Sequence, residues 1–406
     1  MAAISPKPIG GLLACATASL LGQDARSAEA YGNEWSVDAA YFSYSEEERV
    51  DVQSYIFDVQ GNLSDRDSIE LGVVYDTMTG STPTGAIQSA SPTTVTGTSG
   101  GSFTASGEEG ALASFTDTRL AVDLEWTRNL GRTLRVRPNA YVSVESDYES
   151  VGGGVALEKD VADKQTTFSL ALGGANDEIA RLDGRTPVPG SDTAEGDFAG
   201  EGERVTTDGV LGITHAVNPK TALRFNLFYK VSRGYHTDPY KVVSIANAGN
   251  VELARVYESR PTKRRRRGVL ASWVHEPAPV HTLALDYRYH TDDWGVTSHK
   301  LDFRYRYEVD AGAYFVEPFG RYYTQTAADF YVRKLDIGQP VPSYVSADSR
   351  LAELHSVTFG AKVGAAVGTN GRLKLRAFRF EQYIENAVFE KRAAEAFQVT
   401  YSHDFR

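Results

Sequence analysis

The chain has 406 residues and a formal net charge of −11, and this acidic balance argues against a nucleic-acid-binding protein, whose domains are normally basic. Tyrosine (22), phenylalanine (18) and glycine (37) are abundant while methionine (2) is scarce. This composition favours strands and turns over helices.

The N-terminal residues have the organisation of a secretory signal peptide. Lys7 supplies a short basic region, Ile9–Leu21 an apolar run, and Ala28-Glu29-Ala30 a small-residue cleavage motif. We therefore predict a signal peptide over 1–30 and one mature domain over 31–406.

Two alternatives stay open for this segment: an uncleaved disordered or core segment, and a lipoprotein cleavage site at Cys15. Cleavage after Ala30 would leave a mature chain without cysteine and therefore without disulfides. Beyond residue 30 no apolar run approaches the roughly 18 residues that a membrane-spanning helix needs.

The rest of the chain alternates apolar and polar residues with a period of two. Segments such as TRLAVDLEW (118–126), LRFNLFYKV (223–231) and LDFRYRYEV (301–309) place aliphatic or aromatic side chains on one face and mostly charged ones on the other. Sustained alternation of this kind predicts an all-β protein. We expect sixteen strands, over residues 34–45, 49–60, 68–78, 115–128, 133–146, 152–160, 165–175, 204–217, 221–234, 264–276, 281–291, 297–309, 313–325, 349–366, 371–384 and 394–405.

The connections alternate between short and long. Turn-forming Asn, Gly, Pro and Asp fill the tight ones at 61–67, 128–132, 161–164, 217–221, 276–280, 310–313 and 368–371. Longer excursions cover 79–114, 176–203, 235–262 and 326–348. This pattern predicts an antiparallel transmembrane β-barrel with short periplasmic turns and long extracellular loops.

The competing fold is a soluble all-β sandwich or propeller. Such a fold would carry Thr, Ser, Lys and Glu on its wet face and a dry core on the other. Opposed Arg, Asp and Glu on one face, with aromatics such as Trp126, Tyr289, Tyr307 and Tyr322 towards strand ends on the other, favour a water-filled lumen and aromatic girdles at two membrane interfaces.

Several long phrases carry a family resemblance. RGYHTDPYKVVS (233–244), YRYHTDDWGVTSHKLDFRYR (287–306), EPFGRYYTQTAADFY (317–331) and YVSADSRL (344–351) resemble the family known as domain of unknown function 3570, Gram-negative proteins regarded as outer-membrane barrels. The resemblance runs from about residue 34 to the C-terminus. It implies a barrel and the cell outer membrane as its location, and it brings no established substrate or catalytic residue.

The expected partners follow from this location. They are outer-membrane lipid and lipopolysaccharide, the barrel-insertion machinery and, by the resemblance, a periplasmic lipoprotein. The final strand ends in an aromatic, Phe405, as the insertion signal does, although Arg406 after it departs from the usual ending.

The charged faces of the predicted strands are the strongest functional clue. We expect them to line the lumen, with Asp123, Glu125, Arg135, Arg137, Arg224, Asp286, Arg288, Asp302, Arg304, Arg306, Glu308, Lys374 and Arg376 as the lining residues. Such a mixed-charge lumen indicates porin-like transport of an unknown substrate, with the long loops 79–114 and 176–203 as candidate constrictions. The alternative is a closed barrel that serves as a structural or docking component.

Two histidine-containing segments are weak candidates for a metal site. Both lie on the predicted long-loop side, and their possible ligands are His236, Asp238, His290, Asp292, Asp293 and His299. The simpler interpretation, which we favour, is turn chemistry in which the aspartates cap their own loop backbone.

The sharpest charge run is RPTKRRRRG (260–268). It suggests contact with lipopolysaccharide phosphates, an anion path, or simply a solvated face paired with loop carboxylates.

No Gly-x-Ser-x-Gly elbow or nucleotide-binding glycine spacing occurs. We therefore expect no enzyme activity, no catalytic residues and no cofactor.

Overall fold

The computed structural model describes residues 35–405 except 48, 97–101, 108–110 and 195. The predicted signal peptide therefore lies outside the described residues. Sixteen antiparallel strands form a closed barrel, as predicted. They are β1 (Trp35–Glu46), β2 (Val50–Asn62), β3 (Asp67–Pro83), β6 (Leu112–Asn129), β7 (Leu134–Val144), β8 (Tyr148–Val161), β9 (Thr166–Ile179), β12 (Gly202–Asn218), β13 (Thr221–Gly234), β16 (Lys263–Ala278), β17 (His281–Asp292), β18 (Thr297–Val309), β19 (Tyr314–Gln325), β21 (Leu354–Val367), β22 (Gly371–Ile384) and β23 (Lys391–Phe405).

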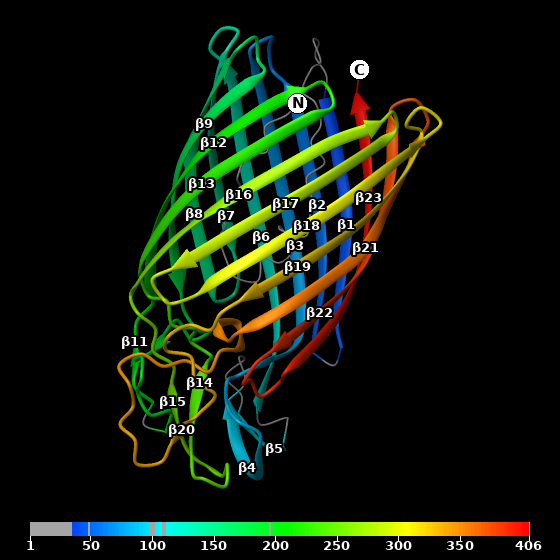
Figure 1. The fold of residues 1–406 in the computed structure, drawn as a ribbon. Helices are drawn as coiled ribbons and strands as arrows, with labels where there is room; N and C mark the ends of the chain where they lie inside the picture. Colours follow the sequence, from blue (N-terminus) through cyan, green and yellow to red (C-terminus); the bar gives the residue numbers. More distant parts are fainter. Residues whose placement is uncertain (1–34, 48, 97–101, 108–110, 195, 406) are drawn as a thin grey trace.

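The first and last strands close the barrel. Strand β1 pairs with β23 from Trp35 opposite Phe405 to Glu46 opposite Ala394, so the sheet has no free edge. Both ends of the described chain lie at the same rim as the tight turns (Figure 1). The predicted arrangement, with tight turns at one rim and long connections at the other, is therefore correct.

Side chains on two strands that are separated by a third strand can contact each other on the concave side of the wall. Such contacts therefore identify which face of each strand points into the barrel. Phe42 on β1 stacks on Phe378 on β22 with ring centroids 6.4 Å apart, and Phe319 on β19 meets the same ring at 6.2 Å. The guanidinium of Arg376 lies 4.6 Å from the centre of the Phe319 ring. The face that carries Arg376 is therefore concave, and the alternate residues face outward.

The convex face is apolar. Large side chains such as Phe57, Leu211 and Phe359 are about half exposed there. Near the rims, histidines pair with aromatic rings, as in Trp273–His275, His281–Tyr305 and His355–Tyr383. Rings with a polar tip suit the boundary between an apolar phase and water.

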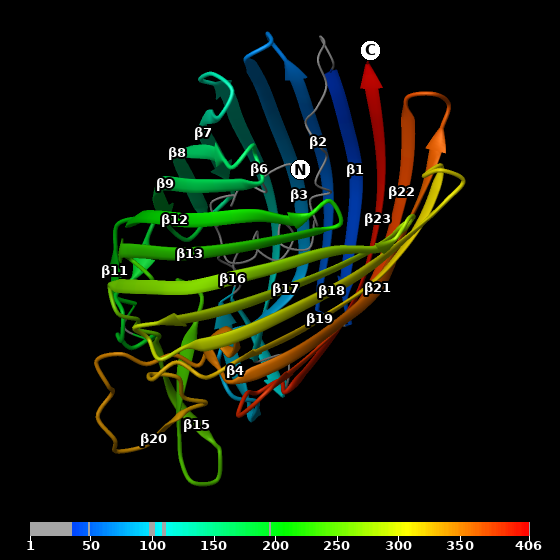
Figure 2. The ribbon, with the colours of Figure 1, turned by 45° about the horizontal axis from the view of Figure 1, so that its top comes forward.

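The long connections do not form separate loops but fold together at one end of the barrel (Figures 1 and 2). They contain β4 (Ser89–Thr96), β5 (Ser102–Gly107), β10 (Thr186–Pro187), β11 (Phe198–Ala199), β14 (Val242–Ala246), β15 (Glu252–Tyr257), β20 (Leu335–Asp336) and a 3-10 helix (Ser349–Leu351). We call the described residues of 84–111, 180–201, 235–262 and 326–353 the loop cap. The predicted strand 349–366 thus begins later, at Leu354, because Asp348 caps this helical turn by accepting the Arg350 backbone N–H.

The loop cap has a small core of its own. Val243, Val256 and Val345 are buried with Leu335 and Ala347, although they come from two loops far apart in the sequence. Strand β14 pairs antiparallel with β15 and parallel with β20, and Ser259 and Val345 bridge the two loops. Within the described ranges, no helix is long and apolar enough to cross a membrane.

Candidate functional site

The strand register shows which residues lie on the same concave face as Arg376 around the barrel wall. Directly opposed residues in antiparallel strands share a face, and one row of such pairs runs Phe380, Thr358, Arg321, Asp302, Asp286, Ser272, Arg224, Thr214, Thr167 and Asp160. The sequence-predicted lining residues Asp123, Glu125, Arg135, Arg137, Arg224, Asp286, Arg288, Asp302, Arg304, Arg306, Glu308, Lys374 and Arg376 occupy this same face of their strands and are all partly buried.

Many of these charges pair along the wall. Arg137 meets Glu125 at 2.5 Å, Arg304 meets Asp286 at 3.1 Å, and Arg306 meets Glu308 at 2.8 Å. Partners that had not been singled out from the sequence, such as Glu158, Asp160 and Arg321, complete the pairs of Arg135 and Asp302. Pairing with neighbours is what makes such charges tolerable in a low-dielectric wall.

Positively and negatively charged side chains are unevenly distributed around the concave face of the barrel. On β1 to β9 the concave face is dominated by carboxylates, namely Asp38, Asp58, Glu70, Asp76, Asp123, Glu125, Glu158, Asp160 and Asp177. On β13 to β22 cations dominate, namely Arg224, Lys230, Arg264, Arg266, Arg288, Lys300, Arg304, Arg306, Arg321, Lys362, Lys374 and Arg376. The acidic arc holds the cations Arg119, Arg135 and Arg137, and the basic arc holds Asp286, Asp292, Asp302, Glu308 and Glu317. An acidic arc thus faces a basic arc across the interior.

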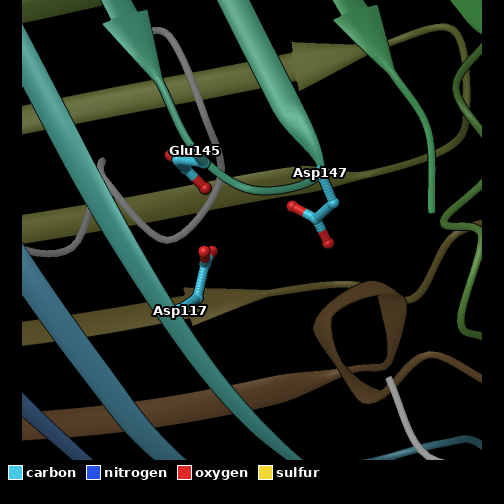
Figure 3. A group of neighbouring side chains, drawn as sticks. All are labelled: Asp117, Glu145 and Asp147. Carbon is cyan, nitrogen blue, oxygen red and sulfur yellow. The ribbon is translucent and has the colours of Figure 1, made fainter. Parts of the chain in front are cut away.

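Three carboxylates converge at the rim next to the loop cap (Figure 3). Asp117 on β6 and Glu145 and Asp147 in the β7–β8 turn can each bring one oxygen within 4.8 Å of the others. Burial, which outweighs attraction to Arg119, raises the pKa of Glu145 to about 7. Burial and the charge of Asp117 raise the pKa of Asp147 to about 6. Asp117 also accepts the Thr118 backbone N–H at 2.8 Å, so the cluster is in part turn chemistry.

The six metal candidates do not gather into one group. Within the described ranges the three-carboxylate cluster above is the one set with suitable spacing. His236 Nδ1 lies 3.0 Å from the Gly234 carbonyl oxygen and must donate to it, so Nε2 accepts from the Ser232 hydroxyl at 2.7 Å. Burial lowers the pKa of His236 to about 4. Both ring nitrogens are thus engaged by the protein.

The remaining candidates also have protein partners. Asp238 pairs with Arg350 at 2.5 Å and Asp292 with Arg264 at 2.5 Å. Asp292 and Asp293 accept backbone N–H groups of Trp294 and Arg265. His290 stacks on Phe228, and His299 binds the Tyr287 hydroxyl at 2.8 Å on the convex face. These contacts fit the turn interpretation.

A buried ionic network holds the loop cap together. Arg260 contacts Glu258 at 2.7 Å and Asp348 at 2.7 Å, while Arg350 bridges Asp348 and Asp238. Glu258 is fully buried. Although burial alone would raise it, the guanidiniums of Arg350 and Arg260 hold the pKa of Asp348 well below its ordinary value. The network therefore joins the β13–β16 loop to the β19–β21 loop through ion pairs.

Sequence reasoning missed both the network and the carboxylate cluster. Glu258 and Asp348 are 90 positions apart in the chain, and no periodic pattern connects two loops. Asp117 and Glu145 meet because of the β6–β7 register, which pairs Leu120 with Val144. Glu145 and Asp147 are close in the sequence, but their approach to Asp117 becomes visible only once the register is known.

A closed barrel of sixteen strands, with an apolar exterior and a charged interior, defines a protein of the outer-membrane barrel class. The family model described as protein of unknown function (DUF3570) matches residues 10–399, and the chain belongs to this family. The match begins earlier than the resemblance noted from the sequence, which started near residue 34. No curated protein matches the chain significantly.

Solved structures align with most of the chain at low identity and with TM-scores below 0.5. The CymD monoaromatic hydrocarbon channel is 10% identical with a TM-score of 0.40, covering 93% of this chain and 90% of its own. Pseudomonas aeruginosa OpdK with vanillate is 10% identical with a TM-score of 0.43, covering 92% and 98%. Pseudomonas aeruginosa OccK2 in complex with glucuronate is 12% identical with a TM-score of 0.42, covering 92% and 98%.

Proposed function

We propose that the protein is an integral outer-membrane channel that passes small polar solutes through its lumen without catalysis. The observation that carries the proposal is the concave face, on which an acidic arc opposes a basic arc. Barrels of 16–18 strands leave room for an aqueous channel. The residues predicted from the sequence as lumen-lining belong to both arcs.

The membrane location rests on the convex face. Aliphatic and aromatic side chains cover it between rims that carry histidine–aromatic pairs. An exposed apolar surface of this extent suits lipid rather than water. A closed barrel is one of the two backbone arrangements that satisfy every peptide group in hydrocarbon.

The opposed arcs also suggest a class of solute. Separated charges on facing walls create a field across the pore, and a solute that carries both signs can align with it. Small zwitterionic or polar solutes are therefore the proposed cargo. Large apolar solutes would lose hydration against charged walls and are disfavoured.

Planar-bilayer recording tests the proposal. Purified refolded protein should insert and give discrete, reproducible current steps in KCl, because the charged concave face is expected to be hydrated. Heat-modifiable migration in gels serves as the control that the barrel is folded. Folded protein that inserts and yet shows no current at any voltage would contradict the channel, and it would favour the closed barrel with a docking role.

A further inference from the structure

Four cations gather on the convex face at the rim next to the loop cap. Strand β13 presents Arg233, and β16 presents Lys263, Arg265 and Arg267. The register places Arg233 opposite Lys263 and Arg265 opposite Val231, so all four share one face. Arg233, Arg265 and Arg267 are exposed and Lys263 is partly buried. We call these four residues the rim patch.

The charge run seen in the sequence is therefore divided between two environments. Arg264 and Arg266 alternate with the rim patch and lie on the concave face, where Arg264 pairs with Asp292 at 2.5 Å. The rim patch is the other half of the same segment. The run thus contributes cations to both faces of the wall.

The rim patch differs from other cations near this rim. Arg204 pairs with Asp177 at 2.8 Å, and Arg260 and Arg264 have carboxylate partners within 2.7 Å. In the described part of the chain, no rim-patch side chain forms an ion pair or a hydrogen bond with a protein group. The nearby carboxylate of Asp293 accepts the Arg265 backbone N–H at 2.7 Å instead of its guanidinium.

Like charges on adjacent strands repel one another, so this arrangement is destabilising by itself. It becomes favourable where an external polyanion neutralises it. Glu203, an exposed carboxylate on β12, lies two positions before Val205, which is the residue opposite Arg233. Neither Glu203 nor Asp293 forms an ion pair with a rim-patch side chain, so these carboxylates do not neutralise the four cations.

The position of the rim patch identifies the kind of anion. Towards the middle of the barrel, the convex face continues with exposed Tyr229 and Leu227, and Tyr229 lies directly opposite Arg267. The patch therefore sits at the edge of the apolar band, on the side of the long loops. In a membrane this is the level of lipid headgroups.

We propose that the rim patch is a binding site for the phosphate groups of lipid A in the leaflet on the long-loop side. Three of the four cations are arginines, whose planar fork binds phosphate through two parallel hydrogen bonds. A lipid headgroup that carries more than one phosphate matches a patch spread over two strands. The proposal rests on the outer-membrane location but not on solute passage.

The test compares R265Q/R267Q with wild-type protein in detergent and measures binding of purified lipopolysaccharide by native mass spectrometry. We expect the double variant to bind at least about tenfold more weakly, because two charge-assisted contacts are lost. The charge-preserving variant R265K/R267K should bind with an affinity between those of R265Q/R267Q and wild type, because lysine keeps the charge but not the two parallel hydrogen bonds. Removing the lipid A phosphates should weaken wild-type binding to a similar extent.

The matched control is K159Q. Lys159 is an exposed cation on the same convex face but at the tight-turn rim, where its ammonium binds the Thr133 hydroxyl at 2.8 Å, and its loss should leave binding unchanged. Double-variant affinity within twofold of wild type, or equal binding of phosphatidylglycerol and lipopolysaccharide, would overturn the proposal. If R265Q/R267Q gives the same current steps as wild type, a failed lipopolysaccharide-binding test does not count against the channel proposal.

Discussion

Glu145 gives the barrel a stability that depends on pH, and the raised pKa of Asp147 beside it adds to this dependence. Its pKa is about 7 in the folded protein against an ordinary value of 4.5. Between these values the folded state holds a proton that the unfolded chain has lost, so stability falls as pH rises through this window. We predict that E145Q is more stable than wild type by up to about 3 kcal/mol at pH 8, and by little at pH 4.

The test is to measure the melting temperatures of E145Q and wild type by circular dichroism from pH 4 to pH 8. The difference between the two melting temperatures should grow as the pH rises. E149Q is the control, because Glu149 is an exposed acid only four positions away, on β8. A difference that stays constant over the whole range, or one that grows towards low pH, would contradict the role assigned to Glu145.

The loop cap depends on its buried ions. Removing the guanidinium in R260M leaves Glu258, which is fully buried, without its cation. Breaking one partner of a buried pair typically costs about 3–5 kcal/mol. We predict that the two loops over 235–262 and 326–353 exchange amide hydrogens much faster in R260M, while the barrel strands keep their protection.

Hydrogen exchange followed by mass spectrometry measures the protection of the two loops and of each barrel strand separately. The paired variant E258Q/R260M removes the stranded charge and should recover part of the protection. R185M is the matched control, since the Arg185–Asp183 pair is exposed in another loop and exposed pairs contribute little. Equal loosening in R185M, or no change in R260M, would show that the ions do not hold the cap.

An element can be predicted from the sequence when the interactions that form it are between residues close together in the chain. The sixteen strands could be located because alternation such as Leu301, Asp302, Phe303 and Arg304 is written within each strand. The loop cap could not, because Val243 and Val345 meet only after two loops fold together. The metal hypothesis shows the same limit: Asp292 and Asp293 have side chains that can bind a metal, but Arg264 and nearby backbone groups engage them.

On the scale of the whole molecule, the sequence shows that each strand has a charged face but not how the signs are arranged. Asp58 and Asp123 approach across Gly72, where a Cβ would lie 2.6 Å from Asp123 Oδ1 and 3.0 Å from Asp58 Oδ1. No local pattern predicts this, because the residues lie on three strands. The acidic arc and the basic arc emerge only when the closed register places strands side by side.

Opposed arcs make a directional prediction for the whole pore. Neutralising the basic arc in R304Q/R306Q should shift the reversal potential in a KCl gradient towards cation selectivity, and D123N/E125Q on the acidic arc should shift it towards anion selectivity. Each change should be roughly twofold or more in the permeability ratio, since fixed wall charges set the local ion concentrations. R265Q on the convex face is the matched control and should leave the reversal potential unchanged. Shifts of the same sign for both double variants would mean that the arcs do not act as opposed walls of one conducting path.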